Sequence, residues 1–253
     1  MVGKVGFEPT QPKGNRFTVC RSSPTLPLTQ KFDKYRAMKP TIALYQHHPE
    51  CSQQCCDGMM ISLSEHYNIK LFDESTLKDT IHSGIDIIAF PGGIGDSDTY
   101  YEFFRRRTAN MVADFLDRGG HYLGICMGAY WAGSHYFDLL DDVDAVQYIK
   151  RPGADVRRSY GTYASVLWKN KSEDMYFYDG CALIGDTSKF DTIATYANGD
   201  PMAIIQNRIG IIGCHPESQE FWYQTPWQYL NPQWHQGRHN NLLLGFVNDL
   251  MQR

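Results

Sequence analysis

Residues 119–130 read Gly119-Gly120-His121-Tyr122-Leu123-Gly124-Ile125-Cys126-Met127-Gly128-Ala129-Tyr130. An apolar strand-like run ends at a cysteine between two glycines, and small residues suited to a helix start follow. This is the G-x-nucleophile-x-G pattern, in which one side chain stands on a strained strand-to-helix turn. The positive end of the helix favours thiolate over thiol at Cys126. At this point a buried, unreactive cysteine between glycines is an equally good interpretation.

A second stretch supplies partners for such a nucleophile. Residues 209–217 read I-G-I-I-G-C-H-P-E, a buried strand followed by His215 and Glu217. Pro216 restricts its own φ and biases His215 toward an extended conformation. A histidine base and a carboxylate that orients it are what a thiol nucleophile requires. The alternative is a core histidine beside a surface glutamate.

A third element is Pro91-Gly92-Gly93, which ends an apolar strand over residues 85–90. A backbone amide of this turn, that of Gly93, can pair with the amide of Met127 after the nucleophile. Two such donors form an oxyanion hole for a tetrahedral intermediate. The position of this turn, one strand-helix unit before Cys126, supports its interpretation as part of an oxyanion hole.

These three pieces, in this order, resemble the class I glutamine amidotransferase-like superfamily over residues 40–253. The runs 119–130 and 176–181 are similar to the biotin-protein ligase N-terminal domain family. The resemblance implies an α/β, flavodoxin-like three-layer fold with a mainly parallel sheet, and a triad of Cys126, His215 and Glu217.

The resemblance also implies substrate-binding positions at Gly92 and Tyr130. Typical glutaminase members carry glutamine where this chain has Tyr130, so the tyrosine either reshapes the pocket or packs. Biotin ligation is not implied, because the sequence has no Gly-Arg-Gly-Arg-type nucleotide loop.

From Pro40 onward, apolar runs alternate with helical patterns, as in a parallel sheet covered by helices. The expected strands are 41–45, 69–72, 85–90, 121–125, 166–168, 175–178, 193–196, 202–205 and 208–214. The expected helices are 58–66, 75–83 capped by Ser75, 108–118, one from Met127, and 241–251. A loop is expected after the first strand, around Cys51, Cys55 and Cys56.

Residues 1–37 lack a sustained apolar period and are predicted to be a disordered or spurious extension, with the domain at 38–253. Val5-Gly6-Phe7-Glu8-Pro9-Thr10 resembles the accidental translation of a transfer-RNA gene's T-loop. On that interpretation translation starts at Met38.

Composition excludes several classes of function. A formal net charge of -4 disfavours nucleic acid as a partner. No apolar run reaches the roughly 18 residues of a membrane span, and no secretory signal is evident, so a cytoplasmic location without membrane association is expected. Seven cysteines are expected to be reduced. The group of Cys51, Cys55 and Cys56 near His47 and His48 lacks paired zinc-ligand spacing, so no metal is predicted.

The leading hypothesis is a cysteine-dependent amidohydrolase or amidotransferase acting on a small-molecule amide, without a cofactor. An amidotransferase would need a synthetase partner that accepts ammonia, because no nucleotide-binding loop of the G-x-x-x-x-G-K-[ST] type is present. The rival hypotheses are a binding or regulatory module without turnover, and a peptidase-like hydrolase on the same scaffold.

Overall fold

The structure is a computed structural model that describes residues 39–46, 49–93, 106–224 and 226–253. The predicted extension at residues 1–37 lies outside the described residues, as do His47 and His48. Side chains are described from residue 53 onward in the first helix, so Cys51 is placed by its backbone alone.

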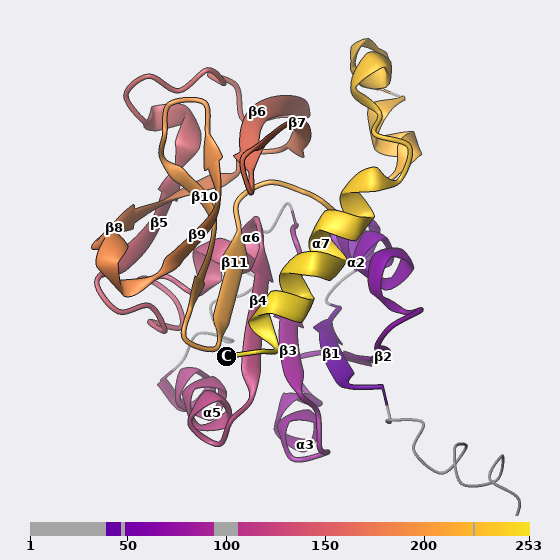
Figure 1. Ribbon diagram of the computed structural model, residues 1–253. Helices are drawn as coiled ribbons and strands as arrows, with labels where there is room; N and C mark the ends of the chain where they lie inside the picture. The colour runs from indigo at the N-terminus through magenta and orange to yellow at the C-terminus, as the bar shows by residue number, and fades with distance from the viewer. Residues whose placement is uncertain (1–38, 47–48, 94–105, 225) are drawn as a thin grey trace, which may run out of the picture. The chain divides into compact units, whose positions relative to one another are not determined.

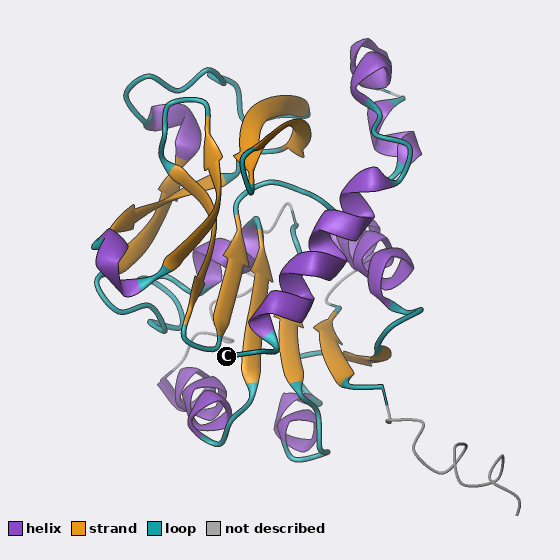
Figure 2. Ribbon diagram, in the orientation of Figure 1, coloured by secondary structure: helices purple, strands orange, loops and turns teal. Residues whose placement is uncertain are grey.

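In the described part of the chain, nine strands form one sheet in the order β2-β1-β3-β4-β11-β10-β9-β6-β7 (Figures 1 and 2). The strands are β1 Thr41–Tyr45, β2 Asn68–Phe72, β3 Ile87–Phe90, β4 His121–Ile125, β6 Thr162–Trp168, β7 Lys171–Phe177, β9 Asp191–Tyr196, β10 Pro201–Gln206 and β11 Ile209–Ile212. A separate antiparallel pair joins β5 Val143–Gln147 to β8 Cys181–Gly185.

The sheet is mixed, so the prediction of a mainly parallel sheet is not confirmed. β2, β1, β3, β4 and β11 pair in parallel, whereas β11, β10, β9, β6 and β7 pair antiparallel. The antiparallel half comes from the chain between β4 and β11, where turns replace helical crossovers. Lys169 and Asn170 link β6 to β7 with φ of 44° and 66°, which is the geometry of a tight hairpin turn.

Helices cover both faces of the parallel half. They are α2 Pro49–Leu63, α3 Leu77–Ile81, α5 Arg106–Asp117, α6 Met127–Trp131 and α7 Arg238–Leu250. Short 3-10 helices are η3 Tyr148–Lys150, η4 Thr187–Lys189, η5 Glu220–Tyr223 and η6 Gln228–Gln233. α2 and α7 pack in one apolar cluster, and α3, α5 and α6 pack in a second (Figure 1).

The alternation of side chains along β1 explains the two clusters. Ile42 and Leu44 belong to the cluster of α2 and α7, whereas Ala43 and Tyr45 belong to the cluster of α3, α5 and α6. Successive side chains of a strand point to opposite faces, so a strand that is apolar throughout needs cover on both. The short apolar runs predicted as buried strands therefore occupy the centre of the described domain.

Two local predictions were wrong, and two strands were missed. The loop expected around Cys55 and Cys56 belongs to helix α2, which starts at Pro49, a residue that suits the first helical position. The N-cap of α3 is Thr76 rather than Ser75, because Asp73 accepts hydrogen bonds from both hydroxyl side chains and organises the preceding turn. The strands β5 and β8 were not predicted.

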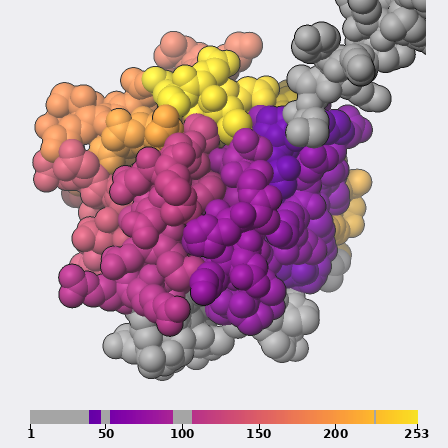
Figure 3. Space-filling view, turned by 90° about the horizontal axis from the view of Figure 1, so that it is seen from below, coloured from indigo at the N-terminus to yellow at the C-terminus, as the bar shows by residue number. Residues whose placement is uncertain are grey.

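The parallel strands run in one direction, and their carboxyl ends meet at one edge of the sheet (Figures 1 and 2). Phe90, Ile125 and Ile212 end β3, β4 and β11, so the segments that follow them come together there. Figure 3 looks at the described domain from below, onto the opposite ends of these strands, where segments from the first half of the chain form most of the coloured surface. None of the described helices has the length and apolar character of a membrane span.

Candidate active site

Cys126 stands on a strained turn between β4 and α6. Its φ is 49° and its ψ is -100°, a conformation that costs free energy in a residue other than glycine. Its backbone N–H donates to the carbonyl of Ile212 at 2.8 Å, which fixes the turn to β11. The side chain is 4% exposed, and its Sγ lies 3.3 Å from the carbonyl oxygen of Tyr178.

The two glycines that flank Cys126 are required by close backbone contacts. A Cβ on Gly124 would lie 2.3 Å from the carbonyl oxygen of Gly128, and a Cβ on Gly128 would lie 2.1 Å from that of Phe90. Side chains do not fit at such distances. The G-x-C-x-G pattern is therefore a packing requirement of the turn.

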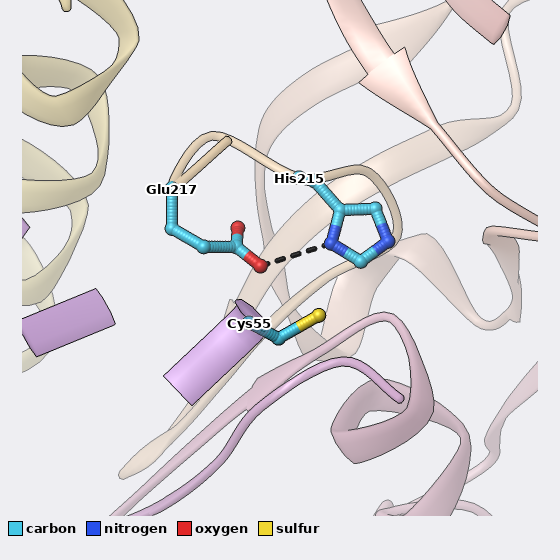
Figure 4. A group of neighbouring side chains, drawn as sticks. All are labelled: Cys55, His215 and Glu217. Atoms are coloured by element: carbon cyan, nitrogen blue, oxygen red, sulfur yellow. Dashed lines mark hydrogen bonds and ion pairs between the residues drawn. The ribbon is translucent and has the colours of Figure 1, made fainter. Parts of the chain in front are cut away.

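His215 and Glu217 follow β11 and form a buried pair (Figure 4). His215 Nδ1 lies 2.9 Å from Glu217 Oε1, so the ring donates to the carboxylate. His215 is 3% exposed and Glu217 is fully buried. The His215 backbone N–H donates to the carbonyl of Tyr176 at 3.0 Å, which anchors the loop to β7.

The surroundings favour the charged form of His215. Burial alone would lower its pKa, but the nearby Cys126 and Glu217 outweigh this and raise the pKa well above 6.5. The rings of Tyr176 and Trp222 pack edge-on against the imidazole, at centroid distances of 5.9 and 5.5 Å. These aromatic contacts limit rotation of the ring about its side-chain bonds.

The Pro91-Gly92-Gly93 turn lies against the same histidine. A Cβ on Gly92 would lie 2.5 Å from His215 Cε1, so only glycine allows this approach. The N–H of Gly128 donates to the carbonyl of Pro91 at 3.3 Å, which ties the turn to the start of α6. Gly93 and Met127 therefore belong to segments that are in contact beside Cys126.

Tyr130 is anchored rather than free. Its hydroxyl donates to the carbonyl of Asp179 at 3.0 Å, and its ring packs at the edge of the cluster formed by α3, α5 and α6. Asp179 adjoins Tyr178, whose carbonyl faces the Cys126 sulfur. The tyrosine thus supports the backbone that lines Cys126.

Cys55 is a second thiol at this site that the sequence interpretation missed. It comes from α2, and its Sγ would lie 3.0 Å from a Cβ on Gly92. Burial raises the pKa of Cys55 to about 11, although the nearby His215 opposes the shift. Its neighbour Cys56 instead packs into the core with Met59 and Leu63. Helical spacing explains why adjacent cysteines point different ways.

Comparisons with known proteins bear on the fold. Residues 45–145 match the family described as biotin-protein ligase, N terminal. A glutamine amidotransferase from Thermotoga maritima is similar in structure, with TM-score 0.56, 10% identity, and coverage of 85% of this chain and 99% of that chain. A protein assigned to GMP synthase, from Thermoplasma acidophilum, gives TM-score 0.55 and 16% identity, over 86% of this chain and 96% of that chain.

A third similar structure is PurLQS from Thermotoga maritima, with TM-score 0.51 and 14% identity, over 81% of this chain and all of that chain. No curated protein matches the sequence. The fold is that of class I glutamine amidotransferase-like proteins. Within that class, the chain is similar in sequence to the biotin-protein ligase N-terminal family.

Proposed function

We propose that the protein is a cysteine-dependent amidohydrolase or the amidase component of an amidotransferase, with Cys126, His215 and Glu217 as its triad. The observation that carries the proposal is the strained, glycine-flanked Cys126, which interacts with an imidazole whose Nδ1 is held by Glu217. The raised pKa of His215 supports a charged imidazole paired with Cys126.

In the proposed reaction, the Cys126 sulfur attacks the amide carbonyl carbon and forms a tetrahedral intermediate. The C–N bond then breaks, ammonia leaves with the proton of His215, and a thioester remains on Cys126. Water attacks the thioester while His215 takes its proton, which releases the carboxylic acid and restores the pair. The amides of Gly93 and Met127 are the proposed oxyanion donors.

Glutamine is the first substrate to test, and a synthetase that consumes the ammonia is the proposed partner. The similar structures assigned to GMP synthase and PurLQS support a partner of this kind. Gly92 and Tyr130 are the proposed substrate-binding positions. The cytoplasmic location predicted from the sequence stays a prediction.

The test is release of ammonia from glutamine, asparagine and small amides, with and without candidate synthetases. We expect release by the wild type, and its loss in Cys126→Ser. Cys214→Ala is the matched control, because this thiol adjoins His215 in sequence but packs against Tyr196. Activity that survives in Cys126→Ser would contradict the proposed nucleophile.

A binding or regulatory module without turnover is the second candidate, and Tyr130 favours it. Tyr130, whose hydroxyl donates to the Asp179 carbonyl, stands at the position where typical glutaminases carry glutamine. If this tyrosine alone blocks glutamine, Tyr130→Gln should gain glutaminase activity. A wild type inactive on every amide, with a folded and equally inactive Tyr130→Gln, would favour the module.

A further inference from the structure

Cys55 has no part in the proposed reaction, yet it lies beside two residues of the triad (Figure 4). Among the described residues, one ligating atom from each of Cys55, His215 and Glu217 lies within 4.8 Å of the other two. A thiol, an imidazole and a carboxylate are the three side-chain types that bind zinc. We propose that these three residues form a binding site for a thiophilic divalent cation of the Zn²⁺ type.

A buried oxygen without a partner supports the site independently of the cluster. Glu217 Oε2 is buried and accepts no hydrogen bond within the described residues. A buried polar atom without a partner carries a desolvation cost that a ligand can relieve. A cation bound by the Glu217 carboxylate would relieve that cost.

The required geometry is close to the geometry present. Zinc–ligand bonds of about 2.0 to 2.3 Å place tetrahedral ligand atoms about 3.3 to 3.8 Å apart. Two ligand atoms at the 4.8 Å limit would have to approach each other by about 1.0 to 1.5 Å, which is within the range of a Cys55 side-chain rotation. His215 Nδ1 and Glu217 Oε1 lie 2.9 Å apart, so a cation that replaces the hydrogen between them would widen this separation to about 3.3 Å.

The backbone holds the ligands in place. A Cβ on Gly58 would lie 2.5 Å from the carbonyl oxygen of Glu217, so α2 packs directly on the loop that carries the other two ligands. Gly58 lies three residues after Cys55, on the same side of the helix. The two elements thus meet at a contact that only glycine permits, next to the proposed ligands.

The cation would compete with protons and with the proposed reaction. Cys55 must lose its thiol proton to bind a cation. Binding should therefore release protons and strengthen as the pH rises. Since His215 and Glu217 are also the proposed base and its orienting group, a bound cation would slow chemistry at Cys126.

The experiment is equilibrium dialysis of the chelator-treated full chain against Zn²⁺, together with Co²⁺ absorption spectra. We expect one ion per chain and a thiolate-to-cobalt band in the wild type. Cys55→Ser should weaken zinc binding by about 100-fold and remove that band, because loss of a ligand costs at least as much as loss of a supporting contact. Cys56→Ala is the matched control and should bind as the wild type does.

Cys126→Ser lacks the proposed nucleophile but keeps all three proposed ligands, so it should still bind the ion. That result separates the cation site from the proposed reaction. Circular dichroism establishes that each variant is folded, and Cys55→Ala replaces Cys55→Ser if the latter is not. Equal zinc affinity in the wild type and a folded Cys55 variant would overturn the proposal. A wild-type cobalt spectrum without a thiolate band would overturn it as well.

Discussion

At the scale of single residues, the strained conformation of Cys126 needs support from its neighbours. A positive φ in a residue other than glycine, such as Cys126, costs of order 1 to 3 kcal/mol and persists where the surroundings enforce it. Here the support is the hydrogen bond to Ile212 and the close passage of the backbone past Gly124 and Gly128. The turn places the Cys126 sulfur at the edge of the sheet where the segment with His215 follows β11.

The thiols of the site should differ in reactivity. Iodoacetamide near neutral pH should modify Cys126 before Cys55 and Cys214, because burial raises the pKa of Cys55 to about 11 and that of Cys214 to about 12. Peptide mass spectrometry over time measures each rate. Modification of Cys214 as fast as that of Cys126 would contradict an activated nucleophile.

The charge partner of Cys126 should control that rate. His215→Ala should slow labelling of Cys126 by about tenfold or more, because loss of an opposite charge disfavours the thiolate. Glu217→Gln should have a smaller effect, since the carboxylate acts through the imidazole. If His215→Ala leaves the labelling rate of Cys126 unchanged, His215 does not act as the base of the proposed mechanism.

At the scale of elements, the contact between α2 and the loop after β11 is the feature that sequence periodicity does not reveal. Gly58 lies inside a helix, where glycine is normally unfavourable by roughly 0.5 to 1 kcal/mol relative to alanine. Its retention here is explained by the Glu217 backbone, which occupies the space of a Cβ. The helix and the loop therefore share one close contact.

Gly58→Ala should lower the free energy of unfolding by about 1 to 3 kcal/mol, because the new methyl group forces the Glu217 carbonyl away. Gly245→Ala in α7 is the matched control, since a Cβ there meets nothing within 4 Å. It should raise stability by roughly 0.5 to 1 kcal/mol. Urea unfolding measures both, and stabilisation by Gly58→Ala would show that the contact is absent.

At the scale of the whole described domain, a buried polar network joins α7 to β7 and to the segment that follows Glu217. His239 Nε2 donates to Glu173 at 3.1 Å, and the stacked ring of His235 lies 3.3 Å from the Ser218 hydroxyl. Burial lowers the pKa of both histidines to about 3, with the charge of Arg238 adding to the effect.

Acid should therefore weaken the fold through these histidines. Each is neutral when folded and protonates near pH 6.5 when unfolded, so its contribution is present above that pH and is lost as the pH falls toward about 3. One such histidine changes stability by about 1.4 kcal/mol per pH unit in this window. His239→Gln, whose amide can still donate to Glu173, should reduce the slope by up to that amount.

Urea unfolding of the wild type and His239→Gln at pH 7, 6 and 5 measures the difference in slope. The variant removes one titrating group while other groups, including His215, contribute equally to both proteins. Parallel pH profiles for the two proteins would show that His239 is not held neutral by the fold.

The predicted extension is tested by truncation. A chain that starts at Met38 should unfold at the same temperature as the full chain, because terminal segments without buried apolar contacts contribute little stability. Differential scanning calorimetry of the two chains makes the comparison. A loss of several degrees on truncation would show that residues 1–37 pack against the domain.

Much of the parallel half was predictable because its signals are local. Apolar runs such as residues 121–125 indicate strands buried on both faces, and the glycines at 124 and 128 indicate the turn around Cys126. His215 and Glu217 are separated by one proline, so their placement also depends on a short stretch of chain. For features of this kind, steric rules over a few residues constrain the structure.

Tertiary structure alone decided the remainder. Whether the strands between residues 143 and 206 pair in parallel or antiparallel depends on contacts between distant segments, and their irregular pattern did not specify the partner. The approach of Cys55 to His215 depends on how tightly α2 packs on the loop after β11, at Gly58. Such contacts join residues far apart in the chain, and their free energy comes from close packing of surfaces that form only when the domain folds.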